Sequence, residues 1–433
     1  MNFQQNLKQA TLEKIKCSLM KDMPSGLQRD FYLWGISDAN PNRHEFLQLV
    51  GMNQVINLTT HILEPMVGAN DWQKMAEYCG LIHAYFMYEL VSDDLAVGLS
   101  HIPIRDASML TRKDILHSFN GAMVKKLSGV PNHSSELLEF VQPTTLNISG
   151  YSQPTTREKY VAQFQKFLKA HPEYTSTSFN FDLWSILIAN IESCHTLLET
   201  TAHLQSSLVI HQGFINRYAS VSQSLEAHIN MSLEELTNIG THTVSVIPVL
   251  AYFIGVITEI INPQSEIKGV IEDGLLEDAL ATAATIIRIL NDIGVIATYS
   301  TGKRTSLIHT LWKSFESKPA NIQTMTQLLC HVGNKTEVLT RIQKDILHGE
   351  FNICLHNLAY TESIEYGISI FSENLTYFAQ VYRHSQMHLR DVLAVLDRRL
   401  GSNTVSSLIN GFINFHEQIY THRFDTSAGE YVA

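Results

Sequence analysis

Apolar residues recur at spacings of three and four positions through long segments of the chain. The segment LWSILIANIESCHTLL, residues 183–198, shows this period, and no segment of comparable length alternates apolar and polar residues with a period of two. Proline and glycine punctuate these segments at short breaks, for example at 24–26, 129–132 and 262–263. The pattern predicts an all-α fold, a single large helical domain whose successive helices are joined by short turns.

No long low-complexity linker and no internal repeat divides the chain. We expect an N-terminal helix or extension over 1–30, one helical domain over 31–425 and a C-terminal tail over 426–433. The first segment, MNFQQNLKQATLEKIKCSLMKD, is polar and predicts a surface helix. Two helical halves meeting near 150–180 remain an alternative.

Composition excludes several classes of protein. The 433 residues include 42 acidic and 31 basic side chains, a net charge of −11, which argues against a chain-wide nucleic-acid footprint. The five cysteines are scattered and form no CxxC pair, so we expect neither a disulfide framework nor a thiolate zinc site. The N-terminus lacks the apolar core of a secretory signal, and we expect a cytoplasmic protein.

The most apolar stretch, VSVIPVLAYFIGVITEII at 244–261, is nearly long enough to cross a bilayer. It contains Pro248, Gly255 and Glu259, and no cluster of Lys or Arg flanks it. We therefore predict a buried central helix and no membrane span.

The first candidate for chemistry lies on the predicted helix LIHAYFMYELVSDDLAVG, residues 81–98. Asp93 and Asp94 stand at the end of its apolar run, one turn after Glu89. Adjacent carboxylates on a core-facing helix are costly to bury unless they bind a cation or a partner, and their hard oxygens suit a Mg²⁺ that also contacts a phosphate. The alternative is a solvated helix end beginning near Ser92.

The second candidate is the helical segment ATAATIIRILNDIGVIATYSTGKR, residues 281–304. Asn291 and Asp292 intrude there among apolar residues, and both are poor residues for a helix interior, which suggests a role beyond helix formation. The alternative is a helix that stops at Asn291, with Gly294 as its cap.

Together the two segments resemble class I terpene synthases, because an apolar helix bearing DD is followed about two hundred residues later by one bearing R-x-x-N-D. In that family the two motifs face each other across a helical barrel and hold three Mg²⁺ ions against the diphosphate of a prenyl substrate. The resemblance implies a class I terpenoid synthase-like helical barrel, catalytic Asp93 and Asp94, Mg²⁺ ligands among these two residues, Asn291 and Asp292, and diphosphate binding by Arg288.

Two further segments carry the resemblance. NIGTHTVSVIPVL, residues 238–250, is similar to the kinked helix that triggers ionisation, with Gly240 where the break would fall. IYTHRFDTS is similar to the segment with an Arg-Tyr pair over the diphosphate, here Arg423 and Phe424, and the resemblance implies that Arg423 is catalytic. The implied function is ionisation and cyclisation of a linear prenyl diphosphate with release of diphosphate, by a monomer or homodimer.

The chain departs from the family pattern at the metal ligands. Positions i, i+4 and i+8 form one stripe on a helix, and here they are Asn291, Val295 and Tyr299 instead of Asn, Ser and Glu. Thr298 lies on nearly the same face, and we expect its hydroxyl to contribute to metal binding. Val97 stands where DDxxD would place its third acid.

The positively charged side chains available to bind the diphosphate also differ from the family pattern. No arginine closely precedes Thr243, where the family usually has a diphosphate sensor. Lys303, Arg304 and Arg423 are therefore candidates to bind the diphosphate in its place.

Two other functions remain open from the sequence. The first is a helical binding or partner protein of the same fold whose altered motifs no longer assemble a metal cluster. The second is a helical metal-dependent oxidase that uses Glu192 and His195, an E-x-x-H pair.

Overall fold

The computed structural model describes residues 2–96, 109–138, 154–174, 183–228, 230–264 and 266–421. Every regular element in these ranges is a helix, and none of the residues described there forms a strand. The predicted all-α fold is therefore confirmed.

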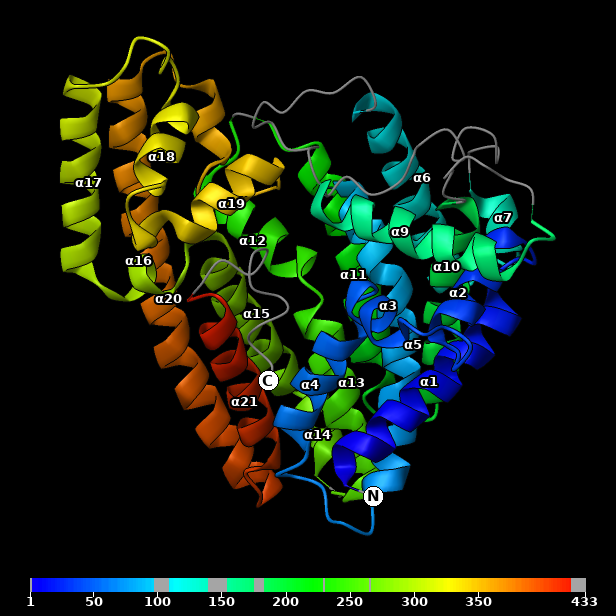
Figure 1. The fold of residues 1–433 in the computed structure, drawn as a ribbon. Helices are drawn as coiled ribbons and strands as arrows, with labels where there is room; N and C mark the ends of the chain where they lie inside the picture. Colours follow the sequence, from blue (N-terminus) through cyan, green and yellow to red (C-terminus); the bar gives the residue numbers. More distant parts are fainter. Residues whose placement is uncertain are drawn as a thin grey trace.

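The helices divide into an N-terminal and a C-terminal series (Figure 1). The first series is α1 (Phe3–Asp22), α2 (Leu27–Ile36), α3 (Arg43–Leu49), α4 (Met52–Leu63), α5 (Trp72–Ala96), α6 (Met109–Leu127), α7 (Ser134–Leu137), α9 (Pro154–Ala170), α10 (Leu183–Thr201) and α11 (Ser207–Leu225). The second is α12 (Leu233–Thr243), α13 (Val246–Gly255), the π-helix η1 (Val256–Ile261), α14 (Ile267–Glu272), α15 (Leu275–Ile293), α16 (Val295–Tyr299), α17 (Thr301–Glu316), α18 (Met325–Gly333), the 3₁₀ helix η2 (Glu337–Leu339), α19 (Thr340–His348), the 3₁₀ helix η3 (His356–Tyr360), α20 (Ile364–Leu400) and α21 (Thr404–Ile419).

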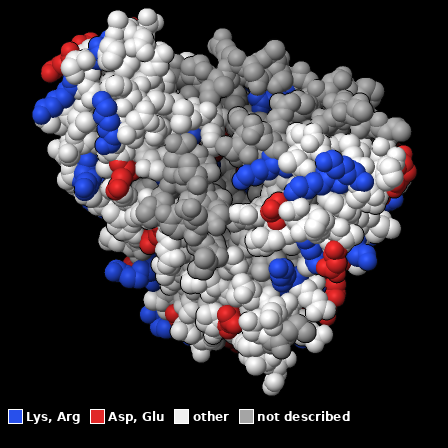
Figure 2. All heavy atoms as spheres, viewed as in Figure 1, with Lys and Arg blue, Asp and Glu red and all other residues white. Residues whose placement is uncertain are grey.

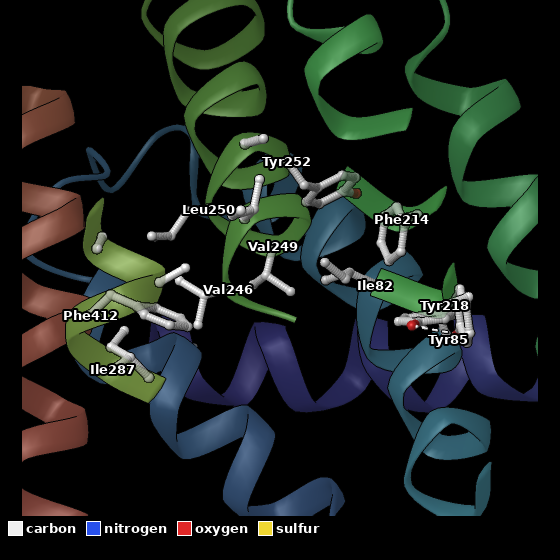
Figure 3. Close-up of a cluster of buried hydrophobic side chains, with 14 of the residues drawn as sticks. Ile82, Tyr85, Phe214, Tyr218, Val246, Val249, Leu250, Tyr252, Ile287 and Phe412 are labelled. Atoms are coloured by element: carbon white, nitrogen blue, oxygen red, sulfur yellow. Dashed lines mark hydrogen bonds between the residues drawn. The ribbon is translucent and has the colours of Figure 1, made fainter. Parts of the chain in front are cut away.

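Two groups of helices meet through α13 and α15. In the first group α5 packs against α1 and α10, and α11 packs against α6, α12 and α13. In the second, α15 packs against α20, α21, α13 and α12, while α17 lies at the outer edge beside α20 (Figure 1). Figure 3 shows apolar side chains of α5, α11, α13, α15 and α21 together between these groups, among them Ile82, Phe214, Leu250, Ile287 and Phe412.

The first helix, α1, has one core face and one polar face. Phe3, Leu7, Ile15 and Leu19 are fully buried, and α1 packs along α5 over much of its length. Asn2 and Gln5 form a capping box at its start, which satisfies two backbone amides of the first turn. Most polar residues of this segment thus lie on the outer face, whereas its apolar stripe joins the common core and Thr11, Ser18 and Asp22 are buried beside it.

The apolar stretch predicted to be a buried helix is buried, and it forms α13 followed by η1. Its one charged residue, Glu259, accepts hydrogen bonds from the backbone amides of Gln205 (2.5 Å) and Ser206 (3.0 Å), directly before α11. A carboxylate at a helix N-terminus satisfies amides that have no partner in the helix. Within the described residues, no single helix is both long and apolar enough for a bilayer crossing, and α12 with Val246–Ile261 meets those criteria only as a pair bent by 45°.

On the face of the molecule in Figure 2, basic side chains form a short row over α9, whose exposed positions include Lys159 and Lys169. Elsewhere on this face, charges of both signs are interspersed. This distribution agrees with the composition, which argues against an extended basic surface.

A buried histidine ties three of the N-terminal helices together. The ring nitrogens of His83 on α5 lie 2.8 Å from the hydroxyl oxygens of Thr11 on α1 and Thr59 on α4. The His83 side chain is fully buried, and this burial lowers its pKa to about 3. The neutral imidazole therefore bridges two hydroxyls, and its protonation opposes folding.

We predict that His83→Gln removes part of the acid sensitivity of the fold. Because the folded pKa lies below that of the unfolded chain, stability is fully present above about pH 6.5 and is lost as the pH falls toward 3. Between pH 7 and pH 5 the natural protein is expected to lose about 2 kcal/mol more than the variant does. Urea unfolding at both pH values measures this, with the exposed His44→Gln as control, and equal losses in the natural protein and His83→Gln would refute the assignment.

Candidate functional site

The first motif lies at the C-terminal end of α5, where Glu89 and Asp93 occupy successive turns. Glu89 is buried, whereas the side chain of Asp93 is 67% exposed. The backbone at Asp94 belongs to the same helix, but its side chain lies outside the described residues, as does Val97. One candidate carboxylate of this motif is therefore available at the surface.

Arg217 of α11 joins these two carboxylates. Its Nη2 lies 2.7 Å from Oε1 of Glu89 and 3.5 Å from Oδ1 of Asp93. Burial by itself lowers the pKa of Arg217, but the charges of Glu89 and Asp93 outweigh it and raise this pKa above its ordinary value. The guanidinium thus stays charged although its side chain is only 7% exposed.

Glu89 receives further donors on the side away from solvent. Its Oε2 accepts hydrogen bonds from the Tyr218 hydroxyl (2.6 Å), the Ser92 hydroxyl (3.1 Å) and the Asn190 amide (3.3 Å). Tyr218 also forms a hydrogen bond with Tyr85, drawn in Figure 3. A buried carboxylate with this many donors is well compensated, which fixes the position of Glu89 and, through it, of Arg217.

The pKa of Asp93 is shifted by charged groups from two parts of the molecule. Desolvation by neighbouring protein atoms raises the pKa of Asp93, with the charges of Glu89 and Glu350 adding to the rise and those of Arg217 and Lys344 opposing it. The solvent exposure of the side chain limits this rise. Lys344 on α19 and Glu350 just beyond it follow the second motif in sequence, so the end of α5 faces that part of the molecule.

A break between α12 and α13 lies between the two motifs. The two helices meet at a bend of 45°, and Nε of Arg217 donates a hydrogen bond to the hydroxyl of Ser245 at this break (3.0 Å). On its other side, Nη1 of Arg288 donates to the hydroxyl of Thr243 (3.2 Å). Two arginines from different helices therefore hold the hydroxyls on either side of the break.

Gly240 is not at this break, contrary to the sequence prediction. It lies inside α12, three residues before the end of that helix, where a Cβ would come within 2.9 Å of Ile353 Cγ2 and 3.2 Å of Arg288 Cγ. Glycine at this position allows α12 to approach Arg288 closely. Its role is packing, and the helix ends at Thr243 instead.

The residues of the second motif do not lie on one continuous helix. Helix α15 ends at Ile293, Gly294 has a φ of +84°, and α16 begins as a separate short helix at Val295. The cap of the alternative prediction, Gly294, is confirmed, but the helix ends at Ile293 and not at Asn291. Asn291, Val295 and Tyr299 therefore do not share one continuous helical face.

One carboxylate oxygen of Asp292 is engaged by the protein's own donors, whereas the buried Oδ1 has no hydrogen-bond partner among the described residues. Its Oδ2 accepts hydrogen bonds from Nε (3.0 Å) and Nη2 (2.8 Å) of Arg288 and from the backbone amide of Ile353 (2.8 Å). Arg288 Nη2 also donates to the carbonyl oxygen of Phe351 (2.6 Å). Desolvation raises the pKa of the fully buried Asp292, and Arg288 opposes this rise.

Asn291 and Thr298 are engaged as well. The backbone carbonyl and side-chain oxygens of Asn291 accept hydrogen bonds from Nε and Nη2 of Arg341 (3.0 and 2.5 Å). The buried Thr298 hydroxyl donates to the carbonyl of Gly294 (2.7 Å). Asn291 and Thr298 are therefore engaged within the protein and do not fit the predicted Mg²⁺ site, and no set of three or more His, Cys, Asp or Glu side chains suited to a metal ion occurs among the described residues.

The other residues predicted to bind the diphosphate have different positions in the structure. Arg304 donates from Nη1 to the carbonyls of Ala297 (2.7 Å) and Thr298 (2.8 Å), so it satisfies the end of α16 rather than a diphosphate. Lys303 lies on the exposed face of α17. Arg423 and Phe424 lie outside the described residues.

The pair proposed for an oxidase is also accounted for. Glu192 accepts hydrogen bonds from Lys126 (3.2 Å) and the Ser134 hydroxyl, and His195 lies 3.7 Å from Glu199. Neither residue belongs to a metal-binding group in the described part of the chain. The structure therefore adds no support for that alternative.

Sequence reasoning missed Arg217, which is the centre of the site. A signal was present, because Ile210, Phe214 and Arg217 lie seven and three residues apart and so share the apolar face of α11. A charged residue on such a face requires a buried partner. Ser245 and Arg341 gave no comparable signal.

Two hollows occur at other places on the molecule. One, of about 400 Å³, lies between α2 and the end of α9 and is lined by Asp30, Leu33, Trp34, Ser37, Ala39, His171, Glu173 and Tyr174. The other, of about 270 Å³, lies near the α17–α18 connection and is lined by Pro319, Asn321, Ile322, Gln327, Cys330 and His331. Neither includes a residue of the two arginine clusters.

The chain matches no family model, no curated protein and no solved structure.

We predict that Gly240→Ala destabilises the fold and disturbs Arg288. The added methyl group must displace Ile353 or Arg288, which costs about 1–3 kcal/mol and outweighs the gain in helix propensity of about 0.5–1 kcal/mol. Gly302→Ala on α17 is a matched control, because no atom lies within 4 Å of the added Cβ, and its stability should be unchanged or slightly raised. Denaturant unfolding of both variants measures the difference, and a Gly240→Ala protein as stable as the control would contradict this close approach.

Proposed function

We propose that the chain is a class I terpene synthase that ionises a linear prenyl diphosphate and cyclises the resulting cation. The supporting observation is the pair of arginines, Arg217 and Arg288, that hold the two sides of the α12–α13 break. The substrate is then a small prenyl diphosphate, and the protein acts as a monomer or homodimer.

We assign binding of the diphosphate to Arg217. A departing diphosphate gains negative charge, and a fixed guanidinium stabilises that charge without reorganising. All three nitrogens of Arg288 donate to Asp292, Thr243 or Phe351, whereas one contact of Arg217 is to the exposed Asp93. An anion therefore reaches Arg217 by replacing a single exposed partner.

Apolar and aromatic side chains adjoin this end of the molecule. Tyr85, Phe214 and Tyr218 lie together at the right of Figure 3, and Arg217 lies 5.7 Å from the centre of the Tyr218 ring. Aromatic faces attract positive charge, and a surrounding of this kind excludes water from a carbocation. These residues would surround the cation that ionisation leaves behind.

No step is assigned to Mg²⁺ at the second motif, since the side-chain oxygen of Asn291 and Oδ2 of Asp292 already accept hydrogen bonds from Arg341 and Arg288. Of the acids in the proposed metal set whose side chains are described, Asp93 alone is exposed. The enzymatic assay therefore includes Mg²⁺ and a chelator as separate conditions.

A second candidate function keeps the fold and has no catalytic step. The same engagement of Asn291 and Asp292 favours it, together with the end of α15 at Ile293. In this case the protein binds a partner or a ligand without ionising it.

The test is incubation of the full chain with prenyl diphosphates of ten, fifteen and twenty carbons, with Mg²⁺ or with EDTA, followed by detection of hydrocarbon and released diphosphate. We expect cyclic hydrocarbon from at least one substrate, and a fall in kcat/KM of about 10²–10³ in Arg217→Gln, because one fixed donor to the leaving group is lost. Arg390→Gln, which removes an exposed arginine of α20, should retain full activity. Absence of hydrocarbon and diphosphate release with every substrate would favour the second candidate.

A further inference from the structure

Two carboxylates contact one nitrogen of Arg217 at different distances and with different exposure to solvent. Oε1 of Glu89 lies 2.7 Å from Nη2 and belongs to a side chain that is 5% exposed. Oδ1 of Asp93 lies 3.5 Å from the same nitrogen and belongs to a side chain that is 67% exposed. The contact of Arg217 with Glu89 is thus short and buried, whereas its contact with Asp93 is longer and exposed to solvent.

We propose that Asp93 is an internal competitor in an anion site, where its carboxylate takes the place that a diphosphate oxygen occupies on Arg217. This inference rests on the proposed function and assigns Asp93 a role opposite to that of a metal ligand. The site recognises a diphosphate, and Glu89 is its positioning residue.

The unequal contacts determine which carboxylate leaves. Displacing Glu89 would leave a buried charge without Arg217 and break the arrangement with Tyr218, Ser92 and Asn190. Displacing Asp93 returns an exposed carboxylate to water and ends only a contact at the outer limit of hydrogen bonding. An incoming anion therefore exchanges with Asp93 and leaves Glu89 in place.

The guanidinium is oriented for this exchange before any ligand arrives. Nε is held by Ser245 and Nη2 by Glu89, so two of its three nitrogens have fixed directions. A planar guanidinium held in this way binds a phosphoryl oxygen with little loss of freedom. Ser245 lies at the α12–α13 break, so the anion site adjoins the break directly.

The competitor and metal-ligand roles predict opposite effects of Asp93→Asn. As a competitor, Asp93 repels an anion and occupies its donor, so its neutral analogue should bind an anion more tightly. As a ligand to Mg²⁺, it should bind a metal diphosphate less tightly once the carboxylate is lost.

The experiment is calorimetric titration of the full chain with inorganic pyrophosphate in EDTA, repeated with Mg²⁺. We expect Asp93→Asn to bind pyrophosphate about three- to tenfold more tightly than the natural protein in both conditions. The exposed Asp391→Asn makes the same change in net charge on α20 and should alter the dissociation constant by less than about twofold. Arg217→Gln should lose at least tenfold in affinity, and circular dichroism verifies that each variant is folded.

Equal or weaker binding by Asp93→Asn in EDTA overturns the inference, and so does absence of pyrophosphate binding in every folded variant. Since Asp93 is exposed, its variant keeps the inference testable even where Arg217→Gln does not fold. Tighter binding without any product from prenyl diphosphates would support the anion site and reject the synthase. Product formation from prenyl diphosphates without tighter pyrophosphate binding by Asp93→Asn would support the synthase and reject Asp93 as a competitor.

Discussion

Buried positive charge is the constraint on which this structure depends. Arg217 and Arg288 are both nearly inaccessible to solvent, and each is neutralised by a buried carboxylate, Glu89 from α5 in one case and Asp292 one turn along α15 in the other. Removing one member of such a pair typically costs about 3–5 kcal/mol, because the remaining charge has no partner in a medium of low dielectric constant. Both arginines also reach the α12–α13 break, so the positions of α5, α11 and α15 are set relative to that break.

The two sequence motifs therefore differ in how far their side chains are engaged by the protein. In the second motif, Asn291 accepts hydrogen bonds from Arg341, and Oδ2 of Asp292 accepts them from Arg288 and the Ile353 amide. In the first, Asp93 remains exposed beside a fixed guanidinium. Exchange with a ligand is consequently easier at the end of α5 than at the end of α15.

The hydrophobic period was sufficient to predict the all-α fold and the burial of 244–261, because helical repeat and burial are properties of local sequence. It also identified Asp93 and Asp292 as polar residues in apolar runs that need an explanation, whereas Arg288 was singled out by the family resemblance. It could not predict that Arg217 meets Glu89, since these residues are far apart in sequence and only the packing of α5 against α10 and of α11 against its neighbours brings them together. The expectation that Thr298 lies on nearly the same helical face as Asn291 failed for a local reason, because Gly294 has a φ of +84° and ends α15 before Thr298.

A crystal structure of the chain with inorganic pyrophosphate bound is the decisive measurement. We expect phosphate oxygens within hydrogen-bonding distance of Arg217, Asp93 turned toward solvent, and the Glu89–Arg217 and Arg288–Asp292 pairs unchanged. Pyrophosphate bound instead at Asn291 and Asp292, with Arg288 and Arg341 displaced from them, would contradict this expectation.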